Sequence, residues 1–295
     1  MTISKENTVI GFVGTGVMGK SMAGHLLRAG YQVLAYNRTK ARAEELIQMG
    51  AVWQDTVAEL AARSDLIITI VGYPKDVEEV YLGKDGIINH ARTGSYLVDM
   101  TTSAPALARK IYAEALAKGM YALDAPVSGG DIGAKEARLA IMVGGDTAVF
   151  DALVPIFNLL GKNVNLQGEA GAGQHTKMCN QIAIASNMIG VCEAMAYAIK
   201  AGLNPETVLK SIESGAAGSF SLTNLAPRML ANNFAPGFYV KHFIKDMTIA
   251  LDSAHAMGLL TPGLELAKSL YDKLAEQGEE NSGTQALFKL YMKYQ

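Results

Sequence analysis

The stretch Val9-Ile10-Gly11-Phe12-Val13-Gly14-Thr15-Gly16-Val17-Met18-Gly19 decides the fold of this chain. Residues 9–13 are mostly apolar and predict a strand, and residues 20–29 predict a helix that ends at Gly30. Between them stands the spacing Gly-x-Gly-x-x-Gly. These glycines permit a tight turn, a close backbone approach to a pyrophosphate and close packing of helix against strand. The pyrophosphate would lie at the positive end of the helix dipole. The stretch therefore predicts a dinucleotide-binding loop made by Gly14, Thr15, Gly16, Val17, Met18 and Gly19.

Short apolar runs alternate with helical segments over the rest of the first half of the chain. Strands are predicted at 32–36, 66–71, 96–100, 121–127 and 139–143, and helices at 40–49 and 104–118. Strands that alternate with helices form βαβ units with a mostly parallel sheet. Because the strands are continuously apolar, we expect helices on both faces of the sheet. The fold class is therefore α/β, with an N-terminal Rossmann dinucleotide-binding domain.

The pattern changes near residue 166, after which no further strand is predicted. Glycines and prolines separate a series of helical segments. These segments are 172–200, 205–214, 221–231, 243–257, 262–277 and 283–293. We therefore predict two domains, an NADP-binding Rossmann domain at 1–165 and an all-helical substrate and oligomerisation domain at 166–295.

Composition excludes several classes of protein. The chain has 295 residues, of which 49% are hydrophobic and 18% charged, with a net charge of −2. Such a balance gives no field that would recruit nucleic acid or an anionic membrane. Two cysteines, Cys179 and Cys192, have no partners at metal-binding spacing, so neither a metal site nor a disulfide framework is expected.

The chain is expected to be cytoplasmic. Its polar N-terminus lacks the apolar segment of a signal peptide. The most apolar stretch, Ile182 to Gly202, contains Asn187, Glu193 and Lys200, which make it a poor membrane span and favour a buried helix.

The end of the second strand indicates which dinucleotide binds. An acid at that position would bind the ribose 2′-hydroxyl of NAD, but this chain has Asn37-Arg38-Thr39. Arg38 can bind a 2′-phosphate through its forked guanidinium, and Asn37 and Thr39 can donate further hydrogen bonds. We predict NADP as the cofactor, with NADPH preferred over NADH. The alternative is that Arg38 is an ordinary solvated residue at a helix start.

Two segments that follow predicted strands carry polar residues. One is Asp99 to Ser103, which contains Thr102, and the other is Asp124 to Gly130. Carboxyl ends of parallel strands line the ligand crevice in such sheets. Ser128, Gly129 and Gly130 offer a hydroxyl and unobstructed N–H groups, which together can hold a carboxylate. The alternative for this segment is a plain glycine turn.

A third segment, Gly171 to Gln181, begins the first long helix of the second half. Asn180 and Gln181 follow Lys177 by three and four residues, so all three side chains share one helix face. A lysine that faces a closed cleft is a suitable proton donor, because burial lowers its pKa toward neutrality. The alternative is a surface lysine near a helix start.

Together with Phe243-Ile244-Lys245-Asp246-Met247, these segments resemble the β-hydroxyacid dehydrogenases over almost the whole chain. The family includes 3-hydroxyisobutyrate dehydrogenase, tartronate semialdehyde reductase and the glyoxylate and succinic semialdehyde reductases. The resemblance implies a homodimer or homotetramer built through the helical half. It also implies a role for each matching residue: Thr102 at the nicotinamide, Ser128, Gly129 and Gly130 on the substrate carboxylate, Lys177 as general acid and base, Asn180 and Gln181 at the substrate, and Lys245 at the cofactor or site.

The chain departs from the family pattern at two places, and one of them is Phe220, which stands where relatives often have tryptophan and leaves the size of the substrate pocket open. The other lies after the lysine. Many members have asparagine four residues after the lysine, whereas this chain has Gln181 preceded by Asn180, as in tartronate semialdehyde reductases. The expected reaction is reversible hydride transfer between nicotinamide and a small 3-hydroxy acid or semialdehyde that bears a carboxylate, similar to 3-hydroxyisobutyrate. An imine reductase of similar architecture and a non-catalytic NADP-binding assembly protein are the alternatives, and Lys177 argues against both.

Overall fold

The computed structural model describes residues 3–293, which form two compact units. One unit ends at Lys177 and the other begins at Met178. Helix α9 (Ala172–Lys200) supplies residues to both units. The predicted domain boundary after residue 165 stays a prediction. The first compact unit extends beyond that residue and includes the last strand of the sheet and the first turns of α9.

The first unit is built around one nine-stranded sheet within the described residues, in the order β3-β2-β1-β4-β5-β6-β8-β7, with β9 paired to β8. Strands β1 to β6 run parallel, and β8 pairs antiparallel with β6 and β7. The predicted mostly parallel sheet is therefore confirmed. The strands are β1 (Val9–Val13), β2 (Gln32–Tyr36), β3 (Val52–Trp53), β4 (Leu66–Thr69), β5 (Tyr96–Asp99), β6 (Tyr121–Asp124), β7 (Val127–Ser128), β8 (Leu139–Gly144) and β9 (Gly161–Gly168).

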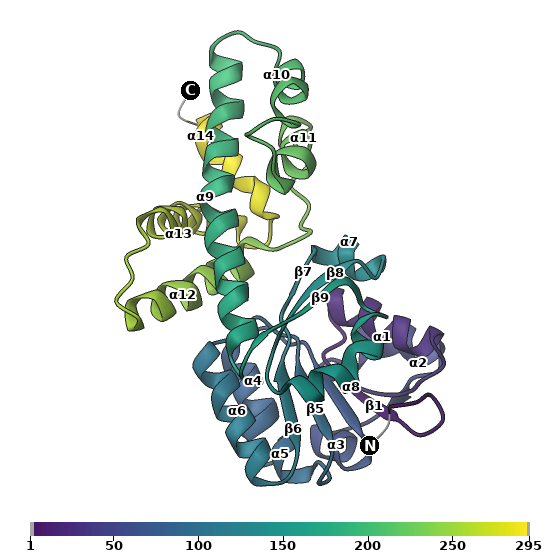
Figure 1. Ribbon diagram of the computed structural model, residues 1–295. Helices are drawn as coiled ribbons and strands as arrows, with labels where there is room; N and C mark the ends of the chain where they lie inside the picture. The colour runs from purple at the N-terminus through teal and green to yellow at the C-terminus, as the bar shows by residue number, and fades with distance from the viewer. Residues whose placement is uncertain (1–2, 294–295) are drawn as a thin grey trace. The chain divides into compact units, whose positions relative to one another are not determined.

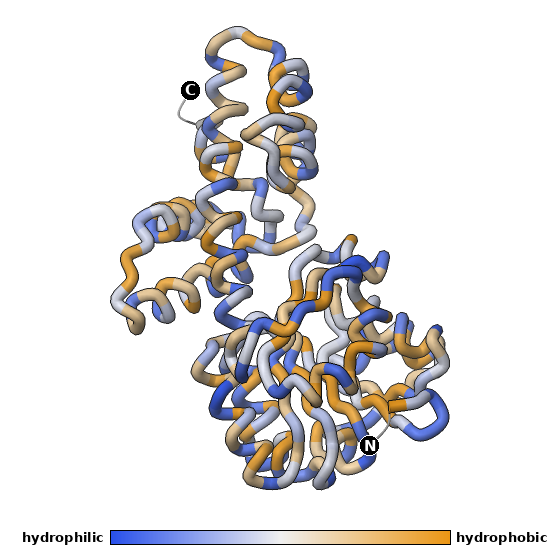
Figure 2. Tube along the Cα trace, viewed as in Figure 1, coloured by the Kyte–Doolittle hydropathy of each residue, from blue (hydrophilic) through white to orange (hydrophobic). Residues whose placement is uncertain are grey.

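Helices cover both faces of this sheet (Figure 1). Alternate residues of β4 show why its sequence is continuously apolar: Leu66 and Ile68 enter one buried cluster and Ile67 enters the other. Each such side chain contributes about 1.5–3 kcal/mol when fully buried. In Figure 2, orange hydrophobic segments recur in the sheet between paler and blue ones. The helices are α1 (Val17–Arg28), η1 (Lys40–Ala43), α2 (Glu44–Gln48), α3 (Val57–Arg63), α4 (Pro74–Leu82), α5 (Ile87–His90), α6 (Pro105–Ala117), α7 (Gly130–Lys135) and α8 (Thr147–Phe157).

The second unit is helical, as predicted, and its core includes an edge-on contact between Phe243 and Tyr271, whose ring centroids lie 5.0 Å apart. Its first helix after α9 is capped by Asn204, whose side chain accepts a hydrogen bond from the N–H of Thr207 at 3.0 Å. The remaining elements are α10 (Pro205–Ile212), η2 (Ser221–Leu225), α11 (Ala226–Leu230), α12 (Val240–Ala256), α13 (Pro262–Leu274), η3 (Ala275–Glu279), η4 (Thr284–Leu287) and α14 (Phe288–Lys293).

Helix α9 is long and apolar enough to cross a membrane by length and composition alone. Its most apolar 18-residue window has a mean hydropathy of 1.6, and 39% of that window is buried. A core helix satisfies the same criteria. Met188, Cys192 and Met195 of this helix are buried, with at most 3% of their surface exposed, which is typical of a core helix.

Strands β3, β7 and β9 were not predicted from the sequence. Polar residues occupy half of β9, including Lys162, Asn163 and Asn165, so it lacks the apolar run that marks the other long strands. Its pairing with β8 comes from tertiary structure, because β8 offers a free edge to a parallel neighbour.

Candidate active site

The glycine-rich loop lies between β1 and α1, at the carboxyl edge of the parallel strands. Gly14 has a φ of +99°, and its N–H donates to the carbonyl of Tyr36 at 2.9 Å. A Cβ on Gly14 would overlap the carbonyl oxygen of Ile70, and a Cβ on Gly19 would overlap the carbonyl oxygen of Gly14. Packing within the protein therefore explains these two glycines.

Gly16 has a different explanation, because no heavy atom lies within 4 Å of a Cβ built there. Gly16 is the N-cap residue of α1, which has no side-chain cap and no acidic residue in its first turn. Beside it, the buried Oγ1 of Thr15 has no hydrogen-bond partner among the residues that the structure describes. Open space, an uncapped helix N-terminus and an unsatisfied hydroxyl all fit a dinucleotide pyrophosphate. Val17, which is exposed, and Met18, which is half-buried, form the first turn of α1.

The residues after β2 have partners that the sequence did not predict. Asn37 accepts a hydrogen bond from the N–H of Thr15 at 3.2 Å and donates to the carbonyl of Thr39 at 3.0 Å, so it fastens the loop to the end of β2. Arg38 forms an ion pair with Asp76 at 3.1 Å, although 77% of its side chain is exposed. Thr39 is exposed.

Asp76 is a carboxylate beside the predicted phosphate contact, supplied by α4 and not by β2. Its other oxygen accepts a hydrogen bond from the N–H of Tyr73 at 3.1 Å, which caps the start of α4. The sequence around Pro74 is typical of a helix start, but nothing in it indicates the pairing with Arg38. The pair leaves most of the guanidinium exposed and available to an anion.

Asp99 and Asp124 end the neighbouring strands β5 and β6 and are paired in register. Asp99 accepts hydrogen bonds from the hydroxyl of Thr69 at 2.8 Å and from the N–H of Thr101 at 3.1 Å. Burial raises the pKa of Asp99 to about 6, and these hydrogen bonds oppose the rise. The network fixes the segment that leads into Thr102, which is half-buried at the carboxyl edge.

Asp124 fastens the beginning of α9 to the sheet. Its Oδ1 accepts a hydrogen bond from the N–H of Gly171 at 2.7 Å, and its Oδ2 accepts one from the N–H of Gln174 at 2.8 Å. Burial raises the pKa of Asp124, and the two backbone donors oppose the rise. Lys177, one turn further along α9, is only 6% exposed. The structure therefore places Lys177 as a buried lysine, in contrast to the surface alternative.

Ser128, Gly129 and Gly130 connect β7 to α7. Ser128 is half-buried, and the φ values of Gly129 and Gly130 are +132° and +64°. Glycine adopts such positive φ values without the steric cost that a Cβ brings. The geometry is compatible with an anion-binding turn at the end of β7.

Asn180, Gln181 and Lys245 belong to the second unit, where they share a polar network with the buried Asp246. Asn180 donates to Gln181 at 2.6 Å, Gln181 donates to Oδ2 of Asp246 at 2.6 Å, and Lys245 pairs with Oδ1 of Asp246 at 2.8 Å. Gln181 and Asp246 are at most 2% exposed. The substrate and cofactor roles of Asn180, Gln181 and Lys245 stay predictions.

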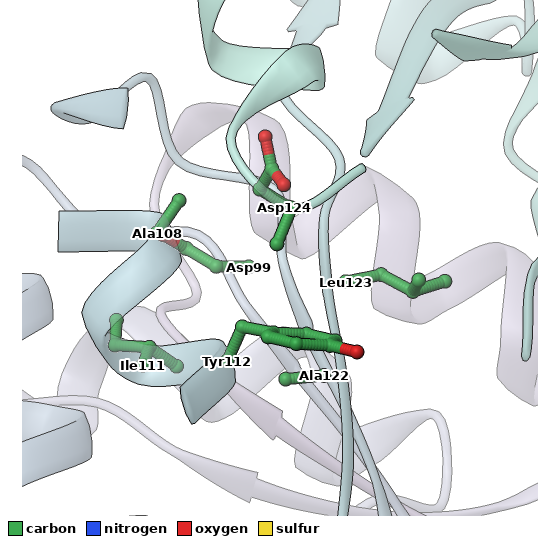
Figure 3. Close-up of a pocket in the computed structure, with 8 residues that line it drawn as sticks. Asp99, Ala108, Ile111, Tyr112, Ala122, Leu123 and Asp124 are labelled. Atoms are coloured by element: carbon green, nitrogen blue, oxygen red, sulfur yellow. The ribbon is translucent and has the colours of Figure 1, made fainter. Parts of the chain in front are cut away.

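A small cavity of about 10 Å³ lies beside Asp99 and Asp124, with Ile111 and Tyr112 of α6 on its other side (Figure 3). This volume corresponds to about one water molecule, so the cavity cannot hold an organic substrate. Within residues 3–293, no cluster of three histidine, cysteine, aspartate or glutamate side chains could hold a metal ion.

Comparison with known proteins identifies matches over both halves of the chain. Residues 9–168 match the NAD-binding domain of 6-phosphogluconate dehydrogenase, and residues 171–291 match the NAD-binding domain of NADP-dependent 3-hydroxyisobutyrate dehydrogenase.

Individual relatives match along nearly their whole length. The uncharacterized oxidoreductase YkwC of Bacillus subtilis is 66% identical, over 96% of this chain and 99% of its own. The 2-hydroxy-3-oxopropionate reductase of Escherichia coli is 40% identical, over 91% of this chain and 92% of its own. A structure of Mycobacterium tuberculosis 3-hydroxyisobutyrate dehydrogenase with L-serine has a TM-score of 0.88 at 30% identity, covering 96% of this chain and 98% of its own.

Proposed function

Because this chain belongs to the β-hydroxyacid dehydrogenase family, we propose that it transfers hydride reversibly between NADP(H) and a small 3-hydroxy acid or semialdehyde that bears a carboxylate. The chain is an NAD(P)-dependent oxidoreductase that acts on a CH–OH group. The observation that carries the finer proposal is Lys177, which is buried on a helix anchored at the carboxyl edge of the cofactor-binding sheet.

Lys177 is the proposed general acid and base. In the reducing direction, its Nζ donates a hydrogen bond and then a proton to the carbonyl oxygen of the substrate, where negative charge develops. In the oxidising direction, the same nitrogen removes the hydroxyl proton. The nicotinamide ring, when bound, supplies or accepts the hydride. Ser128, Gly129 and Gly130 hold the substrate carboxylate, which orients the reacting carbon.

The preference for NADPH rests on Arg38 and on the residues around it. The end of β2 offers no carboxylate to a ribose hydroxyl, and most of the Arg38 guanidinium is exposed. Asp76 holds one edge of that guanidinium and leaves the other donors for a 2′-phosphate. A homodimer or homotetramer formed through the helical residues is also proposed. The exposed Tyr197 (74%) of the second unit supports this, because tyrosine is enriched in interfaces.

The test is NADPH oxidation with a panel of carboxylate-bearing semialdehydes, and NADP reduction with 3-hydroxyisobutyrate and related hydroxy acids. Lys177→Ala should lower kcat by roughly 10²–10⁴-fold while NADPH still binds, because only the proton transfer is lost. Lys135→Ala is the control, since this exposed lysine pairs with Asp131 one turn away on α7. Turnover by Lys177→Ala at the wild-type rate would refute the proposal. Reduction of cyclic imines in place of semialdehydes would favour the imine reductase alternative.

A further inference from the structure

Gln174 is a buried side-chain amide that joins α9 to the segment containing Thr102. Its Oε1 accepts a hydrogen bond from the N–H of Ser103 at 2.9 Å, and its Nε2 donates to the carbonyl of Thr101 at 2.7 Å. The residue is completely buried. Both backbone neighbours of Thr102 are therefore held by one side chain.

Each end of this connection is fixed independently. On the helix side, the N–H of Gln174 donates to Asp124 at 2.8 Å. On the sheet side, the N–H of Thr101 donates to Asp99 at 3.1 Å, and its hydroxyl accepts a hydrogen bond from the N–H of Val71 at 2.9 Å. The Gln174 side chain therefore connects two segments that other hydrogen bonds hold in place. The length of this side chain sets the distance between the two segments.

Lys177 follows Gln174 by three residues, so the two lie within one turn of α9 on neighbouring positions of the helix surface. We propose that Gln174 is a positioning residue that fixes Lys177 relative to Thr102. It thereby keeps Lys177, the proposed proton donor, at a fixed position relative to the nicotinamide that Thr102 is proposed to contact. The inference rests on the proposed function, which assigns these roles to Lys177 and Thr102. A displacement of the reacting groups by about 1 Å can lower the rate by about 100-fold.

The test compares Gln174→Met with Gln285→Met. Methionine preserves the volume of glutamine and removes both hydrogen bonds. Gln285 is a matched control, because it is 1% exposed and its Nε2 donates to the carbonyls of Asn233 and Ala235 at 3.0 and 3.2 Å. We expect Gln174→Met to lower kcat by about 10–100-fold, with the Kd for NADPH within about twofold of wild type. Gln285→Met should lose a similar amount of thermal stability without this loss of kcat.

Two further readouts distinguish positioning from general destabilisation. The primary deuterium isotope effect on kcat should increase in Gln174→Met, because hydride and proton transfer then become slower than product release. Hydrogen exchange should increase in the peptide that spans residues 100–104, and Gln285→Met should leave that peptide unchanged. Should Gln174→Met fail to fold, Gln174→Glu keeps the shape and the acceptor for Ser103, and its ionised carboxylate replaces the donor to Thr101 with a charged oxygen that cannot donate.

The proposed function and the positioning role can fail separately. Wild-type turnover in Lys177→Ala refutes the proposed function, whatever Gln174→Met does. Loss of turnover in Lys177→Ala with wild-type kcat in Gln174→Met refutes only the positioning role, as does an equal loss of kcat in Gln285→Met. If the wild-type chain turns over none of the panel, unchanged exchange of residues 100–104 in the Gln174 variants refutes the connection itself.

Discussion

The carboxylate of Asp124, at the end of β6, holds the N–H of Gly171, 47 residues further along the chain, at 2.7 Å. This contact caps the start of α9 from a strand of the sheet, and the first turn of the helix has no acidic residue of its own. The same carboxylate accepts the N–H of Gln174 at 2.8 Å. A residue of the sheet therefore determines where the helix that carries Lys177 begins.

Asp124→Asn should destabilise the protein and lower its activity. Asparagine has one acceptor oxygen where aspartate has two, so one buried N–H, of Gly171 or Gln174, is left unsatisfied. An unsatisfied buried donor costs about 1–3 kcal/mol. We expect a lower Tm and a lower kcat with little change in the Kd for NADPH, measured by calorimetry, steady-state kinetics and fluorescence titration.

Asp146→Asn is the matched control for this substitution. Asp146 is an exposed aspartate at the start of α8 that accepts hydrogen bonds from the Tyr112 hydroxyl at 3.0 Å. It should change neither Tm nor kcat appreciably, since exposed groups exchange their partners for water. Equal effects of the two substitutions would show that Asp124 has no special role in anchoring α9.

The fold was largely predictable because its determinants are local. The glycine spacing after β1 and the apolar runs of β4 and β5 are patterns of adjacent residues, and both predict the parallel sheet. Helix α9 was also predicted with its observed bounds, 172–200. Strand β9 was not, since its polar residues, such as Asn163 and Asn165, form a strand only by pairing with β8.

The residues of the candidate site were named from the sequence and stay predictions, whereas the contacts that support them were not named. Lys177 and the glycine-rich loop follow from sequence spacing, whereas the pairing of Arg38 with Asp76 joins residues 38 positions apart. Gln174 lay within a segment that the sequence marked, but its partners Thr101 and Ser103 are more than 70 residues away. A single sequence does not reveal such contacts, because no local pattern specifies them.

The glycines of the cofactor loop should separate into two classes by substitution. Gly16→Ala should fold normally, because its backbone conformation suits alanine and a Cβ there meets no protein atom. It should nevertheless weaken NADPH binding by at least about tenfold, since the pyrophosphate needs close backbone approach. Gly14→Ala should destabilise the fold itself, because it adds a clash at the carbonyl of Ile70 and strain at positive φ. Calorimetry and titration with NADPH measure the two effects, and unchanged NADPH affinity in Gly16→Ala would contradict a cofactor at this loop.

Substitutions of Arg38 and of Asp76 should change the preference for NADPH over NADH in opposite directions. Arg38→Ala should weaken NADPH binding by about 10–100-fold and NADH binding little, because a charge-assisted contact to the 2′-phosphate contributes about 1.5–3 kcal/mol. Asp76→Asn should strengthen NADPH binding, since it removes a negative charge 3.1 Å from the guanidinium and keeps an acceptor for the N–H of Tyr73. Titrations with NADPH and NADH measure both effects.

Arg92→Ala is the control for the arginine substitution, because Arg92 forms a comparable exposed pair with Asp65 at 2.9 Å. It should alter neither dissociation constant. A parallel loss of NADPH and NADH affinity in Arg38→Ala would show that Arg38 does not recognise the 2′-phosphate.

The last prediction concerns the pH dependence of stability. Burial raises the pKa of Asp99 from 3.8 to about 6, hydrogen bonds from Thr101 and Thr69 oppose the rise, and the charge of Asp124 on the next strand adds to it. The folded state therefore binds more protons than the unfolded state between about pH 4 and pH 6, so this carboxyl lowers stability as pH rises through that range. Asp99→Asn keeps an acceptor and removes the titration. Relative to wild type, the free energy of unfolding of the variant should rise by about 3 kcal/mol as the pH increases from about 4 to about 6. Above pH 6 this difference should stay constant. Tm values measured at each pH for wild type, Asp99→Asn and the exposed control Asp85→Asn decide the matter. A constant difference between wild type and Asp99→Asn would mean that Asp99 does not titrate in this range.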